Sequence, residues 1–285
     1  MNTPTLPLPQ QRRLGAHFGF TGLPFRKNVQ ALRMFDSQSQ RELRHGLHLW
    51  LEIRGLGLVT GPSGVGKSIS LRRLVAELPT DRYAVHRVGQ IPTTPTGFLR
   101  ALARHLGLRP RLYLADLFED LRGALARHED EHGTHPVLIL DDAEGMRTPT
   151  LDLVRRLTAH ALDGTEHVSI LLAGTEQLLE TLRDPLLVPL RSRFGYAHQL
   201  RAFGMEDARN YVRFHLQAAG GQDKLFTDGA VTALFSASQG VPRQLNQLAL
   251  QALVEAVVHG RDTVDSGLMR RVLQAHPLYA NPRAA

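Results

Sequence analysis

The segment at residues 61–68, GPSGVGKS, is the feature that most constrains how this chain folds. It fits the pattern G-x-x-x-x-G-K-[ST] and directly follows an apolar run at residues 56–60, which is typical of a buried strand. Residues 69–78 then carry apolar side chains at helical spacing. A strand, a glycine-rich loop and a helix in this order predict a loop that binds the phosphates of a nucleoside triphosphate.

The residue types of this loop match the chemistry of phosphate binding. Its glycines let backbone N–H groups turn toward the β-phosphate, Lys67 places its ammonium between the β- and γ-phosphates, and the Ser68 hydroxyl reaches Mg²⁺. We therefore expect ATP and Mg²⁺ as cofactors, with Ser68 as a metal ligand. The expected nucleotide-binding residues of the loop are Gly61, Pro62, Ser63, Gly64, Val65, Gly66, Lys67 and Ser68.

Length and composition narrow the class of protein. A chain of 285 residues holds one large α/β domain and a small second one. It contains no cysteine, which excludes disulfides, thiolate zinc sites and cysteine nucleophiles and is compatible with the reducing cytosol. No apolar run approaches the roughly 20 residues of a membrane helix, and the first residues lack an export pattern. We expect a cytoplasmic protein without a membrane partner.

The charge of the chain predicts a polyanionic partner. The net charge is +7 and the pI is near 10.3, and nearly all of the positive charge is arginine, which suits bidentate phosphate contacts. The alternative is a genome whose base composition favours arginine codons.

The order of the expected elements predicts an α/β fold. Helices at residues 38–52, 69–78, 96–106, 113–131 and 149–162 alternate with strands at 56–60, 83–88, 137–141 and 168–173. Such alternation predicts a three-layer αβα core with a parallel sheet. Four further helices, at residues 205–219, 227–238, 242–259 and 264–275, predict a small all-α lid. The expected division is an extended, flexible arm at 1–16, the core at 17–200, the lid at 201–276 and a tail at 277–285.

Two acids follow the expected strand at residues 137–141. We expect Asp141 to bind Mg²⁺ through water, opposite Ser68, and Asp142 to polarise the attacking water. Asp142 is one methylene shorter than the usual glutamate, so hydrolysis should be slow. One alternative is that Asp142 only caps the following turn, and another is that Glu144 supplies the carboxylate with the missing reach. Thr175, after the next strand, is expected to sense the γ-phosphate or hold the lytic water; the alternative is a turn residue.

Three arginines are candidates for contacts with the nucleotide. Near the end of the core, Arg193, with Arg191 as second choice, is placed to act as an arginine finger in a neighbouring subunit's site. Arg243 lies in the first turn of a lid helix that Pro242 opens, where it would face the γ-phosphate. The alternative for each is a solvated surface arginine.

The chain resembles AAA+ ATPases of the ExeA/TnsC-like group, which includes the ATP-dependent helper proteins of DNA transposons. The resemblance rests on FGFTGLPF at residues 18–25, the GPSGVGKS loop, LILDDAEGM, LLAGTEQL, LRSRF and GVPRQLNQL, and it spans most of the chain after residue 17. It implies that residues 18–25, including Phe20 and Phe25, line the adenine pocket and that Arg243 is the sensor 2 arginine. Asp142 departs from the glutamate of the group, which affects turnover and not binding.

Basic and hydroxyl side chains recur after two of the strands. In AAA+ rings the loops that follow these strands face the central channel, where arginine and threonine donors can track a nucleic-acid backbone. For any one residue the alternative is an ordinary solvated helix face. The expected DNA-binding residues are Thr94, Arg100, Arg104, Arg147 and Thr148.

Residues 128–132, HEDEH, match the H-E-x-x-H pattern of zinc metalloproteases. A zinc helix must pack against a core around its ligands, whereas this segment carries Asp130 and Glu131 between the histidines and is followed by Gly133. We therefore interpret it as a solvated helix end.

The resemblance implies an ATPase that hydrolyses ATP to ADP and phosphate, and the positive charge of the chain is consistent with a nucleic-acid partner. We expect it to oligomerise on duplex DNA, head to tail, as a ring or helical filament, and to recruit or activate a transposase. One alternative is an ExeA-type secretion ATPase, which would be expected to carry a membrane span and a wall-binding module. The others are an ATP-gated scaffold with little hydrolysis and a loader of another ring.

Overall fold

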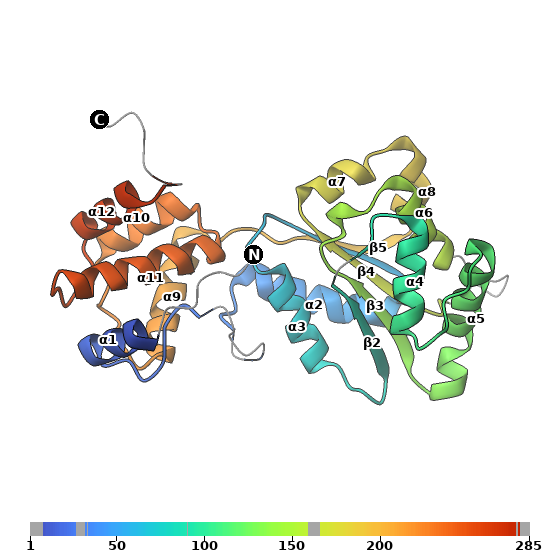
Figure 1. The fold of residues 1–285 in the computed structure, drawn as a ribbon, viewed down its shortest axis with the longest axis horizontal. Coiled ribbons are helices and arrows are strands. Elements are labelled where there is room, and N and C mark those ends of the chain that lie inside the picture. Colours follow the sequence, from blue (N-terminus) through green and yellow to red (C-terminus); the bar gives the residue numbers. More distant parts are fainter. Residues whose placement is uncertain are drawn as a thin grey trace. The chain divides into compact units, whose positions relative to one another are not determined.

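The computed structural model describes residues 8–26, 32, 34–89, 91–158, 166–277 and 279. The chain divides into two compact units. The described residues between 38 and 201 form the first, which we call the core unit, and the described residues on either side of that range form the second, the helical unit. Both are drawn in Figure 1.

The core unit is built on a five-stranded sheet with the order β2-β3-β4-β1-β5. All four strand pairs are parallel, so the carboxyl ends of the strands share one edge of the sheet. β1, which precedes the GPSGVGKS loop, lies between β4 and β5. The strands are β1 (Leu56–Thr60), β2 (Tyr83–Val88), β3 (His135–Leu140), β4 (Ser169–Gly174) and β5 (Phe194–Gln199).

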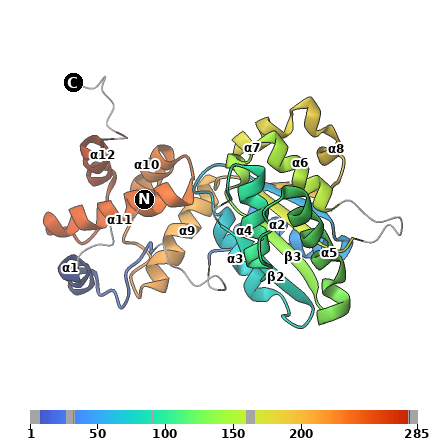
Figure 2. The same cartoon turned by 45° about the vertical axis from the view of Figure 1, so that its right-hand side comes forward.

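Helices cover both faces of this sheet (Figures 1 and 2). One face packs Leu58, Leu138 and Leu172 against the helices from α4 to α8. On the other face Gly57 leaves room for Trp50 of α2, which is fully buried. The helices are α2 (Gln38–Ile53), α3 (Lys67–Glu77), α4 (Pro95–His105), α5 (Leu114–His132), η2 (Ala143–Gly145), α6 (Thr148–Leu157), α7 (Glu176–Leu182), η3 (Pro185–Leu187) and α8 (Val188–Arg191).

The helical unit has an apolar core of its own, with Leu234, Leu245 and Leu253 among its fully buried residues. Side-chain caps start two of its helices: Thr227 accepts the N–H of Ala230, and Asp265 accepts that of Leu268. Figure 2 shows α1 beside α11. The helices are α1 (Leu8–Phe18), α9 (Met205–Ala218), α10 (Asp228–Ser238), α11 (Pro242–Val258) and α12 (Ser266–Ala275).

The expected fold class is confirmed: the chain combines a parallel αβα core with an all-α unit. The extended arm is wrong for residues 8–16, which lie in α1, because Leu14 of this helix is buried in the core of the helical unit. Residues 17–26, 32 and 34–37 likewise group with the helical unit and not with the core unit. The expected tail beyond 279 and the end of the helix expected at 149–162 lie outside the described residues. Within those residues, no helix is long and apolar enough to cross a membrane.

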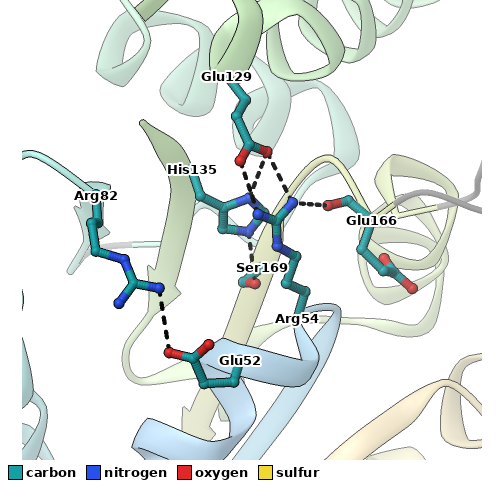
Figure 3. A network of polar contacts seen from close by, with 7 residues as sticks. All are labelled: Glu52, Arg54, Arg82, Glu129, His135, Glu166 and Ser169. Atoms are coloured by element: carbon teal, nitrogen blue, oxygen red, sulfur yellow. Dashed lines mark hydrogen bonds and ion pairs between the residues drawn. The ribbon is translucent and has the colours of Figure 1, made fainter. Parts of the chain in front are cut away.

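A polar network ties together the amino-terminal edge of the sheet (Figure 3). Arg54, just after α2, donates two hydrogen bonds to the Glu129 carboxylate, at 2.9 and 2.8 Å. His135, at the start of β3, lies 3.4 Å from Glu129 through Nδ1 and 2.9 Å from the Ser169 hydroxyl, at the start of β4, through Nε2. Burial lowers the pKa of His135, so its ring is held neutral near pH 7. The network therefore joins two strands, a helix end and the residue that leads into β1.

Arg54 has a φ of +60°, a conformation that costs any residue with a Cβ about 1–2 kcal/mol. Arg54→Ala should lower the free energy of unfolding by about 2 kcal/mol, because it removes charge-assisted bonds. Arg54→Gly should cost about 1 kcal/mol less than the alanine variant, because glycine accepts this φ freely. Urea unfolding of the three proteins checks both values. Equal stabilities of the alanine and glycine variants would contradict the strain at this residue.

Candidate nucleotide-binding site

The loop at residues 61–68 has a backbone that its glycines make possible. Gly61, Gly64 and Gly66 have φ values of +148°, +84° and +115°, in a range that residues with a Cβ rarely adopt. A Cβ on Gly61 would also collide with the carbonyl oxygen of Leu200, which follows β5. Gly66 directly precedes α3, so the amino terminus of this 11-residue helix opens onto the loop. This arrangement suits an anionic ligand, because the first N–H groups of a helix lack intrahelical partners.

The ammonium of Lys67 lies inside the loop. Its Nζ donates to the carbonyl oxygens of Gly61, at 2.7 Å, and Pro62, at 3.1 Å. Burial lowers the pKa of Lys67, and the carboxylates of Glu144 and Glu176 oppose that shift. The lysine is thus a desolvated cation held by two neutral acceptors. A phosphate group would offer it a stronger, charged acceptor.

The two acids expected to act on the nucleotide differ in environment. Asp141 directly follows β3 and is buried, with 7% of its surface exposed. Asp142 has a φ of +58° and is exposed. It precedes the short helix η2, but its side chain makes no capping hydrogen bond there. The alternative role of Asp142 as a cap on the turn therefore lacks its defining contact.

Asp141 and Ser68 fit a magnesium ion. Mg²⁺ is usually held by one or two protein oxygens together with water and phosphate oxygens. A buried carboxylate after β3 and an exposed hydroxyl in the first turn of α3 supply oxygens of the required kind. Within the described residues no group of three or more His, Asp or Glu side chains could hold a metal alone, so the phosphates would have to complete the site.

Thr175 lies between the loop and the acids. It directly follows β4, which pairs with β1 on one side and β3 on the other, and it precedes α7 without capping it by its side chain. Its hydroxyl is therefore not used as a helix cap. The structure brings the loop, Asp141, Asp142 and Thr175 to the same edge of the sheet, because all follow carboxyl ends of parallel strands.

Arg191 and Arg193 lie near the opposite edge. Arg193 immediately precedes β5, whose first residue pairs with Leu56 at the start of β1. Both arginines are exposed. Arg191 donates to the carbonyl of Leu182 at 3.1 Å, and Arg193 to that of Arg155 at 3.3 Å.

Three expected nucleotide contacts belong to the helical unit. Arg243 is exposed in the first turn of α11, as its sequence position predicts. Phe20 packs against Gly221, and Phe25 is 3% exposed with its ring centroid 5.2 Å from that of His215. Phe25 is thus a core residue of its own unit. The contacts of these residues with a nucleotide stay predictions.

Thr94, Arg147 and Thr148, expected to bind DNA, lie at the starts of α4 and α6, whereas Arg100 and Arg104 lie further along α4. Thr94 caps α4 by accepting the N–H of Gly97, and Arg147 is exposed just before α6. The Thr148 hydroxyl donates to Asp184 at 3.0 Å, so a contact with phosphate would require that bond to break. Arg100 is half-buried and Arg104 exposed, both on α4.

Two residues of the site were missed by sequence reasoning. Gln40 of α2 is buried with its amide nitrogen 3.1 Å from where a Cβ on Gly66 would lie. Its position on the otherwise apolar face of α2 was the available signal. Leu200, against Gly61, was missed because β5 was not predicted: the strand alternates half-buried and exposed residues and includes Gly, His and Gln.

The H-E-x-x-H segment has a structural role. Its glutamate, Glu129, faces Arg54 and His135 in the network of Figure 3. The rings of His128 and His132 stack with centroids 4.4 Å apart.

Lys67→Ala should abolish measurable binding of ATP, because the loop loses the cation that would lie between the phosphates. Calorimetric titration with a non-hydrolysable ATP analogue and Mg²⁺ checks this expectation. Arg72→Ala, which removes a positive charge from the same helix, is the matched control and should bind as the unmodified protein does. Unchanged affinity in Lys67→Ala would refute the assignment of the loop.

Comparison with known proteins agrees with this geometry. Residues 52–182 match the family model described as an AAA domain. General secretion pathway protein A of Aeromonas hydrophila is 29% identical over 260 residues, which cover 88% of this chain and 46% of that protein. The chain therefore spans about half the length of this relative.

Solved structures share the fold. The ORC2 protein of Aeropyrum pernix, in ADPNP–ADP complexes, has a TM-score of 0.64 at 15% identity. The match covers 88% of this chain and 71% of the ORC2 chain. Cdc6p of Pyrobaculum aerophilum has a TM-score of 0.61 at 18% identity, with coverages of 88% and 69%. A RuvB variant of Thermotoga maritima has a TM-score of 0.57 at 18% identity, and the match covers 86% of this chain and 73% of the RuvB chain. The chain thus has the fold of P-loop AAA+ ATPases, with a match to the AAA domain family across the centre of its core unit.

Proposed function

We propose that this chain is an ATP-hydrolysing AAA+ protein that assembles head to tail in its ATP-bound state. The observation that carries this proposal is the convergence of the GPSGVGKS loop, Asp141 and Thr175 at one edge of the sheet, between β1 and β3. These groups would bind the triphosphate, hold Mg²⁺ and face the γ-phosphate. When bound, Mg²⁺ would neutralise the charge that develops on the phosphates, and Lys67 would position these phosphates.

The place of Arg193 supports action across a subunit interface. This residue lies at the start of β5, beside the start of β1, whereas the nucleotide loop follows the end of β1. A strand of five residues is about 16 Å long, which exceeds the reach of an arginine side chain. Arg193 therefore cannot reach the nucleotide of its own subunit. Exposed at that edge, it is available to a neighbouring one.

Arg193→Ala should leave ATP binding intact and remove ATP-dependent assembly together with hydrolysis, because the missing charge acts in the neighbour's site. Mixing Arg193→Ala with Lys67→Ala should restore part of the activity. In such a mixture, the intact nucleotide loop of an Arg193→Ala subunit can lie beside the intact Arg193 of a Lys67→Ala subunit. Phosphate release and light scattering follow the two effects. Arg183→Ala is the control, because it removes another exposed arginine, directly after α7, and should leave assembly and hydrolysis unchanged. An inactive mixture in which both variants co-assemble would show that Arg193 is not the finger and would favour Arg191.

For the substrate of the assembly we propose duplex DNA, with recruitment or activation of a transposase as the outcome. The support is the net charge of +7 and the arrangement of α4 and α6. The Thr150 hydroxyl donates to the carbonyl of Thr93 at 3.0 Å, which joins the loop before α4 to the first turn of α6. Thr94 and Arg147 are thereby held on neighbouring exposed loops.

The second candidate is a role in protein secretion. The observation that favours it is the similarity to General secretion pathway protein A, which extends over 88% of this chain. In that case the assembly would act on a protein partner, and the ATP site would work in the same way.

Binding to DNA separates the two candidates. With an ATP analogue present, affinity for duplex DNA should fall steeply as salt rises, because neutralised phosphates release counterions. Arg147→Ala should lower the slope of log affinity against log salt by about 1, whereas the control Arg82→Ala, at the opposite edge of the sheet, should leave it unchanged. Fluorescence anisotropy measures both. Failure to bind DNA at low salt would contradict the DNA role and favour the secretion role.

A further inference from the structure

We propose that Glu144, and not Asp142, is the general base that activates the attacking water. This inference rests on the proposed ATP hydrolysis and assigns its proton acceptor. It replaces the adjacent pair of acids expected from the sequence with a pair separated by two residues, Asp141 for the metal and Glu144 for the water.

The backbone after β3 turns Asp142 and Glu144 to different environments. Asp142, at φ +58°, starts the turn of η2 and is exposed. The amide of Met146 closes this turn by donating to the carbonyl of Ala143 at 3.0 Å. Glu144 lies within the turn and is only partly exposed. The turn thus carries Glu144 away from the line of β3.

The Glu144 carboxylate reaches the end of the neighbouring strand β4. Its Oε2 lies 3.0 Å from where a Cβ on Gly174 would be, so the missing side chain of this glycine leaves the space that the oxygen uses. Gly174 pairs with Thr60, the residue before the nucleotide loop. Glu144 is therefore next to the point where β4 and β1 end together, beside Thr175.

This oxygen also lacks a partner. Oε2 of Glu144 is buried and, among the described residues, accepts no hydrogen bond. Buried carboxylate oxygens are rarely left in that state, because desolvation without a donor is costly. A water molecule placed for attack would supply the missing donor.

Electrostatics relate Glu144 to the phosphate end of the loop. Burial lowers the pKa of Lys67, and the carboxylates of Glu144, Glu176, Asp141 and Asp142 oppose this shift, with Glu144 first among them. In the reaction, the water oxygen bonds to the γ-phosphorus while the bond from phosphorus to the β–γ bridging oxygen breaks. Glu144 takes a proton from the water, and ADP and phosphate leave.

Glu144→Gln should lower kcat for ATP by about 100-fold or more while leaving KM and analogue affinity near those of the unmodified protein. Glu144→Asp should restore part of the loss, because it keeps a base with shorter reach. Glu176→Gln is the matched control: it removes one negative charge that also acts on Lys67, and its turnover should stay unchanged. Asp142→Asn should lose less activity than Glu144→Gln. Steady-state phosphate release and calorimetry give these values.

The outcomes separate this inference from the function on which it rests. If the unmodified protein binds but does not hydrolyse ATP, both fail. If it hydrolyses ATP and Glu144→Gln does so equally well, or if Asp142→Asn loses more, only the role of Glu144 is overturned. Loss of ATP binding in Glu144→Gln would also overturn it, since that result makes the residue part of the binding site and not the base.

Discussion

The parallel pairing of β1 with β4 on one side and β5 on the other is the constraint on which the rest of the structure depends. It aligns Thr60 with Gly174, and the amide of Leu200 donates to the Thr60 carbonyl at 2.8 Å. The loop that follows Thr60 therefore starts between the ends of two strands. Because parallel strands deliver their carboxyl ends to one edge, residues that lie more than 100 positions apart in the sequence meet there.

The two edges of the sheet have different chemistry for the same reason. The carboxyl edge gathers acids, a lysine and a threonine, which are the groups proposed to act on a triphosphate. The amino edge is fixed by the network of Arg54, Glu129 and His135, in which each ionisable group has a partner within the core unit. Arg193 also lies at the amino edge, beside the start of β1. If Arg193 is the proposed finger, its separation from the loop within one subunit would make completion of the site a property of an assembly, and ATP binding would control self-association.

Much of this was predictable from local patterns. Residues 56–78 carry strand, loop and helix signals in one stretch, and glycines at 220–221, 240 and 260 separate the apolar-rich segments of α9 to α12, so both were found close to their observed bounds. β5 was missed because it is half-exposed with a mixed composition, and α1 because prolines before Gln10 suggested an extended arm. The exposure of Asp142 and the unpaired oxygen of Glu144 could not be predicted from the sequence. Both depend on a turn in which Asp142 has a φ of +58°, and an aspartate at this position does not by itself predict that turn. A sequence pattern identifies which acids are present, whereas the turn decides which of them faces the neighbouring strand.

The measurement that most directly tests the central claim is hydrogen–deuterium exchange with and without a non-hydrolysable ATP analogue and Mg²⁺. Binding should slow exchange in three segments, residues 58–70, 140–146 and 172–178, which lie apart in the sequence and converge only at the carboxyl edge of the sheet. Exchange at residues 52–56 and 129–137, around the amino edge, should not change. Protection at the amino edge, or none at the three carboxyl-edge segments when the analogue is bound, would contradict the account.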